Sequence, residues 1–162
     1  MWVMAVIVCM TRILFVCHGN ICRSPMAEYV MKDLVRKVGQ QECWEIASCA
    51  TSTEEIGNPV YPPARAKLAQ YGISCKGHAA RQMTRADYEH YDMIVAMDHN
   101  NLRNMRRFVS DDPLGKVSLL LEHLPETHRR YGCDVADPWY TGDFDATYDD
   151  VHAGCEAILR NK

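Results

Sequence analysis

The chain has 162 residues, the size of one domain with a single core, and its 48% hydrophobic and 24% charged residues are typical of a soluble globular protein. A formal net charge of −3 argues against a nucleic-acid-binding protein, which normally carries a basic excess. The apolar start, MWVMAVIVCM, is too short for a membrane span and lacks the features of a signal peptide. We therefore expect a cytoplasmic protein with neither a nucleic acid nor a membrane as partner. Residues 1–9 are either a short extension or the result of a start assigned upstream of Met10.

Eight cysteines would be enough for a framework of disulfides. A chain of this length can nevertheless fold without covalent cross-links, and disulfides are rare in the cytoplasm. We therefore expect reduced thiols.

The predicted elements alternate between strands and helices. They are, in chain order, a strand at 12–17, a helix from Pro25 to Gly39, a strand at 44–50, a helix at 62–72, a short helix opened by a capping box at 84–87, a strand at 91–97, a helix capped by Asp98, a strand at 116–121, and a C-terminal helix with an apolar stripe from Tyr148 to Leu159. Such alternation predicts an α/β fold in three layers, with a central four-stranded parallel sheet and helices on both faces. We expect one domain over residues 1–162.

The segment FVCHGNICRSP, residues 15–25, lies where the first strand ends and the first helix begins. Cys17 and Cys22 lack the spacing of a zinc site, and no second pair of cysteine or histidine ligands completes one, so we expect no metal. A disulfide between them would leave Arg23 and the Gly-Asn pair unexplained.

An anion-binding loop after the first strand accounts for all of these residues. Backbone N–H groups and the helix dipole converge on one point there, and Gly19 and Asn20 tolerate left-handed backbone angles. Arg23 offers a planar fork that matches two phosphate oxygens, and Pro25 suits a first helical turn. The same donors would stabilise a thiolate on Cys17, which would then face the bound phosphate as a nucleophile.

The string VCHGNICRSPMAE resembles the Cys-x5-Arg-Ser signature of the low-molecular-weight protein tyrosine phosphatases, and the resemblance extends over nearly the whole chain from about Met10. It implies hydrolysis of phosphotyrosine in protein substrates, without metal or cofactor, through a cysteinyl-phosphate on Cys17. Arg23 would bind the phosphate and Ser24 would donate a hydrogen bond to the sulfur. Inorganic phosphate would be the product or an inhibitor.

A second motif supplies a proton donor. Asp137-Pro138-Trp139-Tyr140 is similar to the family's Asp-Pro-aromatic-Tyr loop, which implies that Asp137 is the general acid and that Trp139 and Tyr140 hold the phenyl ring. The other substrate-binding residues implied by the resemblance are His18, Gly19, Asn20, Ile21, Cys22 and Ser24. It also implies a supporting hydrogen-bond network of Asn20, Ser24, Ser48 and His78.

Three positions bear on specificity and regulation. Glu54 stands where animal members often have an aromatic residue, so one wall of the site is expected to be open or acidic. Ile21 offers an apolar wall to a phenyl ring, whereas the branch that acts on phosphoarginine has a threonine there, so we expect a preference for phosphotyrosine. Cys22 is either a packing thiol or a trap for oxidised Cys17.

Other functions remain open on the same residues. They are a phosphoarginine phosphatase or an arsenate reductase of the same fold, and a non-catalytic phosphate-binding redox module. An arsenate reductase would need a relay of cysteines near the middle of the chain, where Cys75 stands alone.

Overall fold

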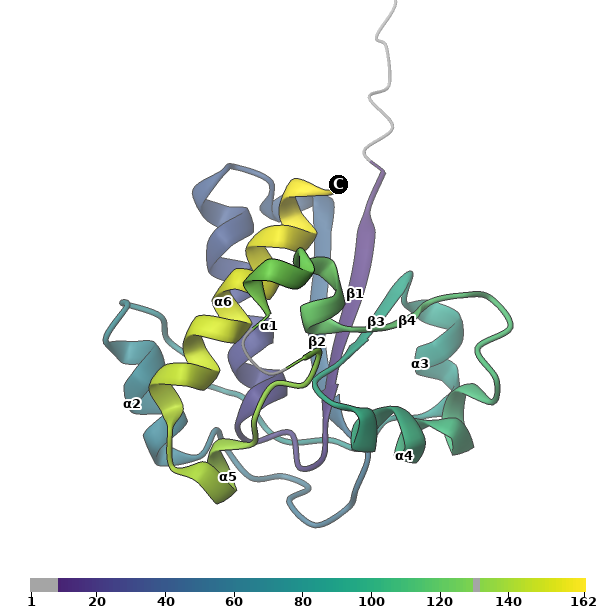
Figure 1. Cartoon of the computed structure of the whole chain (residues 1–162), viewed down its shortest axis with the longest axis horizontal. Helices are drawn as coiled ribbons and strands as arrows, with labels where there is room; N and C mark the ends of the chain where they lie inside the picture. The colour runs from purple at the N-terminus through teal and green to yellow at the C-terminus, as the bar shows by residue number, and fades with distance from the viewer. Residues whose placement is uncertain (1–8, 130–131) are drawn as a thin grey trace, which may run out of the picture.

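A computed structural model describes residues 9–129 and 132–162, so the predicted extension over residues 1–9 falls outside it except for Cys9, which is exposed. In that part of the chain one sheet is formed, with the strand order β2-β1-β3-β4 (Figure 1). Its strands are β1 (Thr11–Cys17), β2 (Trp44–Ala50), β3 (Met93–Ala96) and β4 (Val117–Leu119), all parallel. The predicted four-stranded parallel sheet is therefore confirmed.

Helices cover both faces of this sheet (Figure 1). One face is covered by α1 (Arg23–Lys37), α2 (Pro62–Ala69) and α6 (Phe144–Arg160), the other by α3 (Arg85–His90) and α4 (His99–Val109). The short α5 (Pro138–Thr141) precedes α6. Three 3-10 turns, η1 (Gln41–Cys43), η2 (Leu120–His123) and η3 (Glu126–His128), complete the described elements.

The side chains of β1 alternate between two hydrophobic cores, one on each face of the sheet. Ile13, Phe15 and Cys17 face the core beneath α1 and α6, whereas Leu14 and Val16 face the core beneath α3 and α4. Successive side chains of a strand point to opposite faces, and a parallel sheet covered on both faces has apolar residues in both registers. This explains why residues 12–17 read as a continuous apolar run.

The topology leaves a crevice beside the end of β1. The chain passes from β1 to β2 on one side and then crosses to β3 on the other, and ligands of open α/β sheets bind at the carboxyl ends of strands where the order reverses in this way. The loop after β1 and the N-terminus of α4 meet at this place.

Several element boundaries differ from the prediction, and two of the differences have a clear physical reason. The predicted strand at 116–121 ends at Leu119, because β3 ends at its partner Ala96 and offers no further backbone to pair with. Leu120 and Leu121 are instead buried in η2. The first helix begins at Arg23, two residues before the predicted start at Pro25. Pro25 lies in the first turn as predicted, where its missing N–H costs no intrahelical hydrogen bond.

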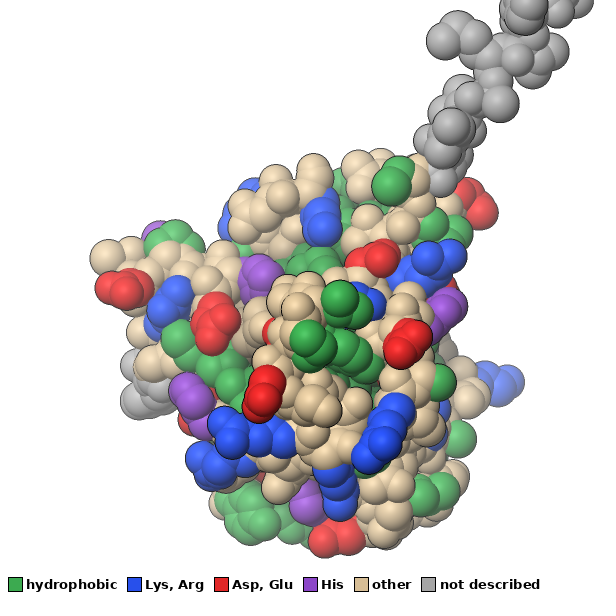
Figure 2. Space-filling view, turned by 90° about the vertical axis from the view of Figure 1, so that its right-hand side faces the viewer, with side chains coloured by type: hydrophobic (Ala, Val, Ile, Leu, Met, Phe, Trp, Pro, Cys, Tyr) green, Lys and Arg blue, Asp and Glu red, His purple; other side chains and the backbone are tan. Residues whose placement is uncertain are grey.

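The face that bears α3 and α4 presents charged side chains of both signs around a small hydrophobic patch, with lysine and arginine prominent in its lower half (Figure 2). Arg103, Arg106 and Arg107 of α4 are exposed there. Among the described residues, no helix has the length and apolar character needed to cross a bilayer.

Candidate active site

The cradle loop, residues 17–23, joins β1 to α1 and curls around the sulfur of Cys17. The Cys17 side chain is buried, and its Sγ lies 3.0 Å from Ser24 Oγ. The backbone N–H of Asn20 donates to the same sulfur at 3.3 Å. The loop thus directs polar donors at Cys17 from two sides.

Asn20 holds the loop in this shape. It has a φ of 59°, in the left-handed region that asparagine tolerates better than most residues. Its Nδ2 donates to Ser24 Oγ at 2.8 Å and to Ser48 Oγ at 2.9 Å. His78 Nε2 contacts the carbonyl of Asn20 at 2.8 Å. The structure therefore brings together all four residues of the predicted network.

Gly19 does not adopt the left-handed backbone conformation that was expected of it. Its φ does not lie in the left-handed region, so only Asn20 of the Gly-Asn pair uses that conformation. A Cβ at position 19 would lie 3.4 Å from Cγ of Glu55 and 3.7 Å from Cγ1 of Ile21. Both distances are ordinary van der Waals contacts, so the packing around the loop does not by itself require a glycine here.

The hydrogen bonds limit where the Ser24 hydroxyl can point. Ser24 Oγ accepts a hydrogen bond from Asn20 Nδ2, so its own proton can go either to the Cys17 sulfur at 3.0 Å or to the carbonyl of Cys49 at 3.4 Å. Ser48 in turn donates to Glu28 Oε1 at 2.6 Å, and Lys32 pairs with Glu28 at 2.5 Å. Glu28 extends the network beyond the residues that the sequence predicted.

Arg23, in the first turn of α1, is almost fully buried between two carboxylates. Its Nη1 lies 2.6 Å from Asp98 Oδ2 and its Nη2 lies 3.3 Å from Asp137 Oδ2. Nη1 also donates to the carbonyl of Val135 at 3.0 Å. Burial disfavours the charged guanidinium, but the charges of Cys17, Asp137 and Asp98 outweigh it and raise the pKa of Arg23. The arginine is a fixed cation.

Asp137 is the N-cap of α5. Its Oδ1 accepts from the backbone N–H of Trp139 at 3.0 Å, while its Oδ2 faces Arg23. The carboxylate is thereby held at the edge of the same cavity as Cys17, although the two residues are far apart in the chain. Asp98 caps α4 as predicted and also fixes Arg23, which the sequence did not indicate.

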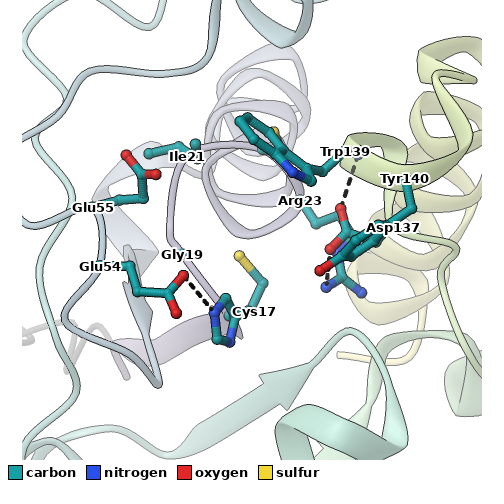
Figure 3. A pocket seen from close by; sticks show the side chains of 11 residues that line it. Cys17, Gly19, Ile21, Arg23, Glu54, Glu55, Asp137, Trp139 and Tyr140 are labelled. Carbon is teal, nitrogen blue, oxygen red and sulfur yellow. Dashed lines mark hydrogen bonds and ion pairs between the residues drawn. The ribbon is translucent and has the colours of Figure 1, made fainter.

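A cavity of about 370 Å³ opens above the cradle loop (Figure 3). Its described lining residues are Cys17, His18, Gly19, Ile21, Cys22, Arg23, Glu54, Glu55, Asp137, Trp139 and Tyr140. Nine of the predicted site residues line this space, and the other four, Asn20, Ser24, Ser48 and His78, support it from beneath. Glu54 and Glu55 lie at one side of the mouth and Trp139 and Tyr140 at the other.

The aromatic side of the mouth rests on Tyr61, which the sequence did not mark. The ring centroids of Tyr61 and Trp139 are 5.0 Å apart, and the backbone N–H of Tyr61 donates to the carbonyl of Ile21 at 2.8 Å. Tyr61 therefore contacts both the cradle loop and the α5 segment. Trp139 and Tyr140 are exposed at 55% and 85%, so both rings are accessible at the mouth of the cavity.

Cys22 is a second thiol beside the nucleophile candidate. Burial, followed by the charges of Cys17 and Asp137, raises the pKa of Cys22 to about 12, so this thiol is neutral at pH 7. All eight cysteines of the chain are free thiols. The two cysteines of the cradle loop are thus chemically distinct in their surroundings: one lies among hydrogen-bond donors and the other is packed with Ile21 and Ala80.

Comparison with known proteins places this geometry among related chains. Residues 12–161 match the family model described as low molecular weight phosphotyrosine protein phosphatase. The low molecular weight protein-tyrosine-phosphatase YfkJ of Bacillus subtilis is 36% identical over 150 residues, covering 93% of this chain and 94% of the relative. The low molecular weight phosphotyrosine protein phosphatase of Gallus gallus is 38% identical over 151 residues, covering 91% and 92%.

Solved structures agree with these relatives. The crystal structure of YfkJ superposes with a TM-score of 0.89 over 94% of each chain, at 36% identity. The crystal structure of DARP, the drosophila arginine phosphatase, superposes with a TM-score of 0.80 at 31% identity, covering 92% of this chain and 96% of that one.

Proposed function

Because this chain belongs to the low molecular weight phosphotyrosine protein phosphatase family, we propose that it hydrolyses phosphotyrosine in proteins through a phosphocysteine formed on Cys17. The observation that carries the proposal is the meeting of a buried thiol, a fixed guanidinium and a carboxylate around one cavity. The proposed reaction is hydrolysis of a phosphoric monoester by water, without a metal or a cofactor. We propose that the protein acts in the cytoplasm, where thiols stay reduced.

In the first step the Cys17 thiolate attacks phosphorus, forming a P–S bond while the P–O bond to the tyrosine breaks. Arg23 and the N–H groups of the cradle loop hold the equatorial oxygens, whose charge grows in the transition state. The leaving phenolate takes a proton from Asp137, which therefore has to be in its protonated form in the substrate complex. The 3.3 Å contact of Arg23 with Asp137 is the longer of its two ion pairs, so phosphate can displace it while Asp98 keeps the guanidinium in place.

In the second step a water oxygen attacks phosphorus, and Asp137, now a carboxylate, accepts the proton of that water. The P–S bond breaks, inorganic phosphate leaves, and the Cys17 thiolate is restored. Ser24, whose hydroxyl lies 3.0 Å from the sulfur, donates its proton to the departing thiolate and stabilises it. Trp139 and Tyr140 offer flat surfaces to the phenyl ring.

The alternatives of the same fold are not favoured. The curated relatives at 36% and 38% identity carry names of tyrosine phosphatases. Cys75, the candidate relay for an arsenate reductase, is buried, and burial raises its pKa, which suits a packing thiol better than a redox nucleophile.

Turnover of a phosphotyrosine peptide and of 2,4-dinitrophenyl phosphate, a monoester with a good leaving group, tests the assigned roles. We expect Cys17→Ser to abolish turnover of both while retaining binding of inorganic phosphate, and Cys43→Ser, at a half-exposed thiol outside the cavity, to remain active. Asp137→Asn should slow the peptide by about 10²–10⁴-fold and the activated ester far less. Equal losses on both substrates would remove Asp137 from the acid role, and an active Cys17→Ser would overturn the mechanism.

A further inference from the structure

The mouth of the cavity has one acidic side. Glu54 and Glu55, which we call the acidic rim, lie on the segment between β2 and α2 and line the cavity together with Cys17 (Figure 3). Glu54 pairs with His18: its Oε2 lies 3.0 Å from His18 Nε2. The acidic rim faces Trp139 and Tyr140 across the opening (Figure 3).

This charge is unexpected at a site for an anion. The lining holds three carboxylates, Glu54, Glu55 and Asp137, against a single arginine, which is already paired with Asp98 and Asp137. A phosphorylated side chain brings a further charge of about −1.5 to −2 at pH 7. At physiological salt, charges within roughly 8 Å of one another are only partly screened. The acidic rim therefore opposes the approach of a phosphorylated peptide that has no positive side chain near its phosphate group.

The acidic rim is held in place. Glu55 Oε2 accepts a hydrogen bond from Asn58 Nδ2 at 2.6 Å, and Glu54 Oε2 lies 3.0 Å from His18 Nε2. The segment is tied to its surroundings by backbone hydrogen bonds from Ser52 to His18 and from Gly57 to Ala80. Two carboxylates are thus preorganised at the edge of the cradle loop, which lowers the entropic cost of binding a partner there.

Each carboxylate can accept more hydrogen bonds. An ionised carboxylate has about four lone-pair sites. Glu54 uses one of its oxygens for the contact with His18, and Glu55 uses one of its oxygens for the contact with Asn58. The Glu54 side chain is 68% exposed, so an incoming ammonium or guanidinium group can reach it. The mouth of the cavity is acidic, whereas the face that bears α3 and α4 has several exposed arginines and a cluster of positive side chains (Figure 2).

We propose that Glu54 and Glu55 select substrates in which lysine or arginine flanks the phosphotyrosine. The inference rests on the proposed function, since it concerns what enters the same cavity. The phosphotyrosine side chain descends between the acidic rim and the Trp139–Tyr140 wall, so the peptide backbone stays at the mouth. A basic residue next to the phosphotyrosine then lies within reach of the acidic rim, and an acidic one is repelled by it.

Three peptides of one sequence test this, with lysine, glutamine or glutamate on both sides of the phosphotyrosine. We expect wild-type kcat/KM to fall in that order, with a ratio of roughly 3- to 30-fold between the lysine and glutamate peptides, as exposed charge pairs give. The ratio should shrink at 0.5 M NaCl. In the Glu54→Gln/Glu55→Gln double variant it should fall to about 2-fold or less.

Glu42→Gln is the matched control, because it removes an exposed carboxylate in η1, outside the cavity lining. It should keep the wild-type ratio. Equal wild-type rates on the three peptides, or a double variant with the wild-type ratio, would overturn the inference and leave the phosphatase activity standing. Failure to hydrolyse even the glutamine peptide would instead overturn the proposed function, and this inference with it.

Discussion

Ile21 stands at the point where a phosphorylated side chain enters the cradle loop. It lines the cavity, is 9% exposed, and packs with Cys22 and Ala80 while its carbonyl accepts from Tyr61. Its branched apolar side chain suits the face of a phenyl ring, and it offers no hydrogen bond to a guanidinium. At the scale of single residues, we predict that this side chain favours phosphotyrosine over phosphoarginine.

Substitution of Ile21 tests that choice. We expect wild-type kcat/KM to be higher on phosphotyrosine than on phosphoarginine peptides, and Ile21→Thr to shift the ratio toward phosphoarginine by about 10-fold, the effect of one hydrogen bond gained to a charged group. Ile21→Val keeps a branched apolar wall and should keep the wild-type preference. Comparable wild-type efficiency on both peptides would contradict the assignment of substrate.

Other residues of the site were beyond sequence reasoning for a physical reason. The cradle loop is a local motif, so Cys17, Asn20 and Arg23 can be predicted from one short segment. Asp98 looks like a helix cap, and nothing in its surroundings in the sequence indicates that it also pairs with Arg23. Tyr61 reads as an ordinary aromatic residue before a proline. Such roles arise from contacts between distant segments, which no local pattern records.

At the scale of elements, helix caps were the most predictable features. The capping box at Thr84 and Asp87 is present in full, with the Thr84 side chain accepting from the Asp87 N–H. The strand ends were less predictable: Leu120 and Leu121 have strand-like neighbours, but η2 replaces the strand because pairing with β3 stops at Leu119. Propensity is local, whereas the end of a strand depends on its partner.

Asp87 also makes stability depend on pH. Burial alone would raise its pKa, but hydrogen bonds from Arg81 and Thr84 outweigh burial and lower it. A carboxyl group with a lowered folded-state pKa stabilises the fold above its unfolded-state pKa of about 3.9, and this contribution is lost as the pH falls through the folded-state value. The loss therefore belongs to the range below about pH 4.

Asp87→Asn should lower the free energy of unfolding by about 1–3 kcal/mol at pH 7 and by less as the pH falls below about 4. Urea denaturation at pH 7 and at pH 3 measures both values. Asp111→Asn, at an exposed carboxylate, is the control and should change little at either pH. A constant difference between wild type and Asp87→Asn across this range would contradict the linkage.

At the scale of the whole molecule, the packing of α6 against η2 closes the core beneath α1. Gly154 of α6 lies so close to Leu120 that an added Cβ would fall 2.5 Å from Leu120 Cγ and 2.7 Å from its Cδ1. Leu120 is fully buried and has little space in which to move. A glycine in the middle of a long helix is thus required by the contact between two elements.

Gly154→Ala should therefore destabilise the protein by about 1–3 kcal/mol, although alanine is the better helix former. Thermal or urea unfolding measures the change. In a Leu120→Ala background the same substitution should cost much less, because the side chain it would strike is gone, so the two effects should not add. An increase in stability from Gly154→Ala in the wild-type background would show that the helix tolerates the extra methyl group.

The two ion pairs of Arg23 have a consequence for the order in which the protein becomes active. Its partners Asp98 and Asp137 are 75 and 114 residues away in the chain. Contacts of such long sequence separation form late, since closing large loops costs entropy before the contact returns any energy. The N-terminal segment that holds Cys17 and Arg23 therefore leaves the ribosome long before Asp98 and Asp137. The carboxylates of these two residues orient Arg23 and complete the site. Catalytic competence is a property of the finished chain, and return of activity during refolding marks the last long-range contacts to form.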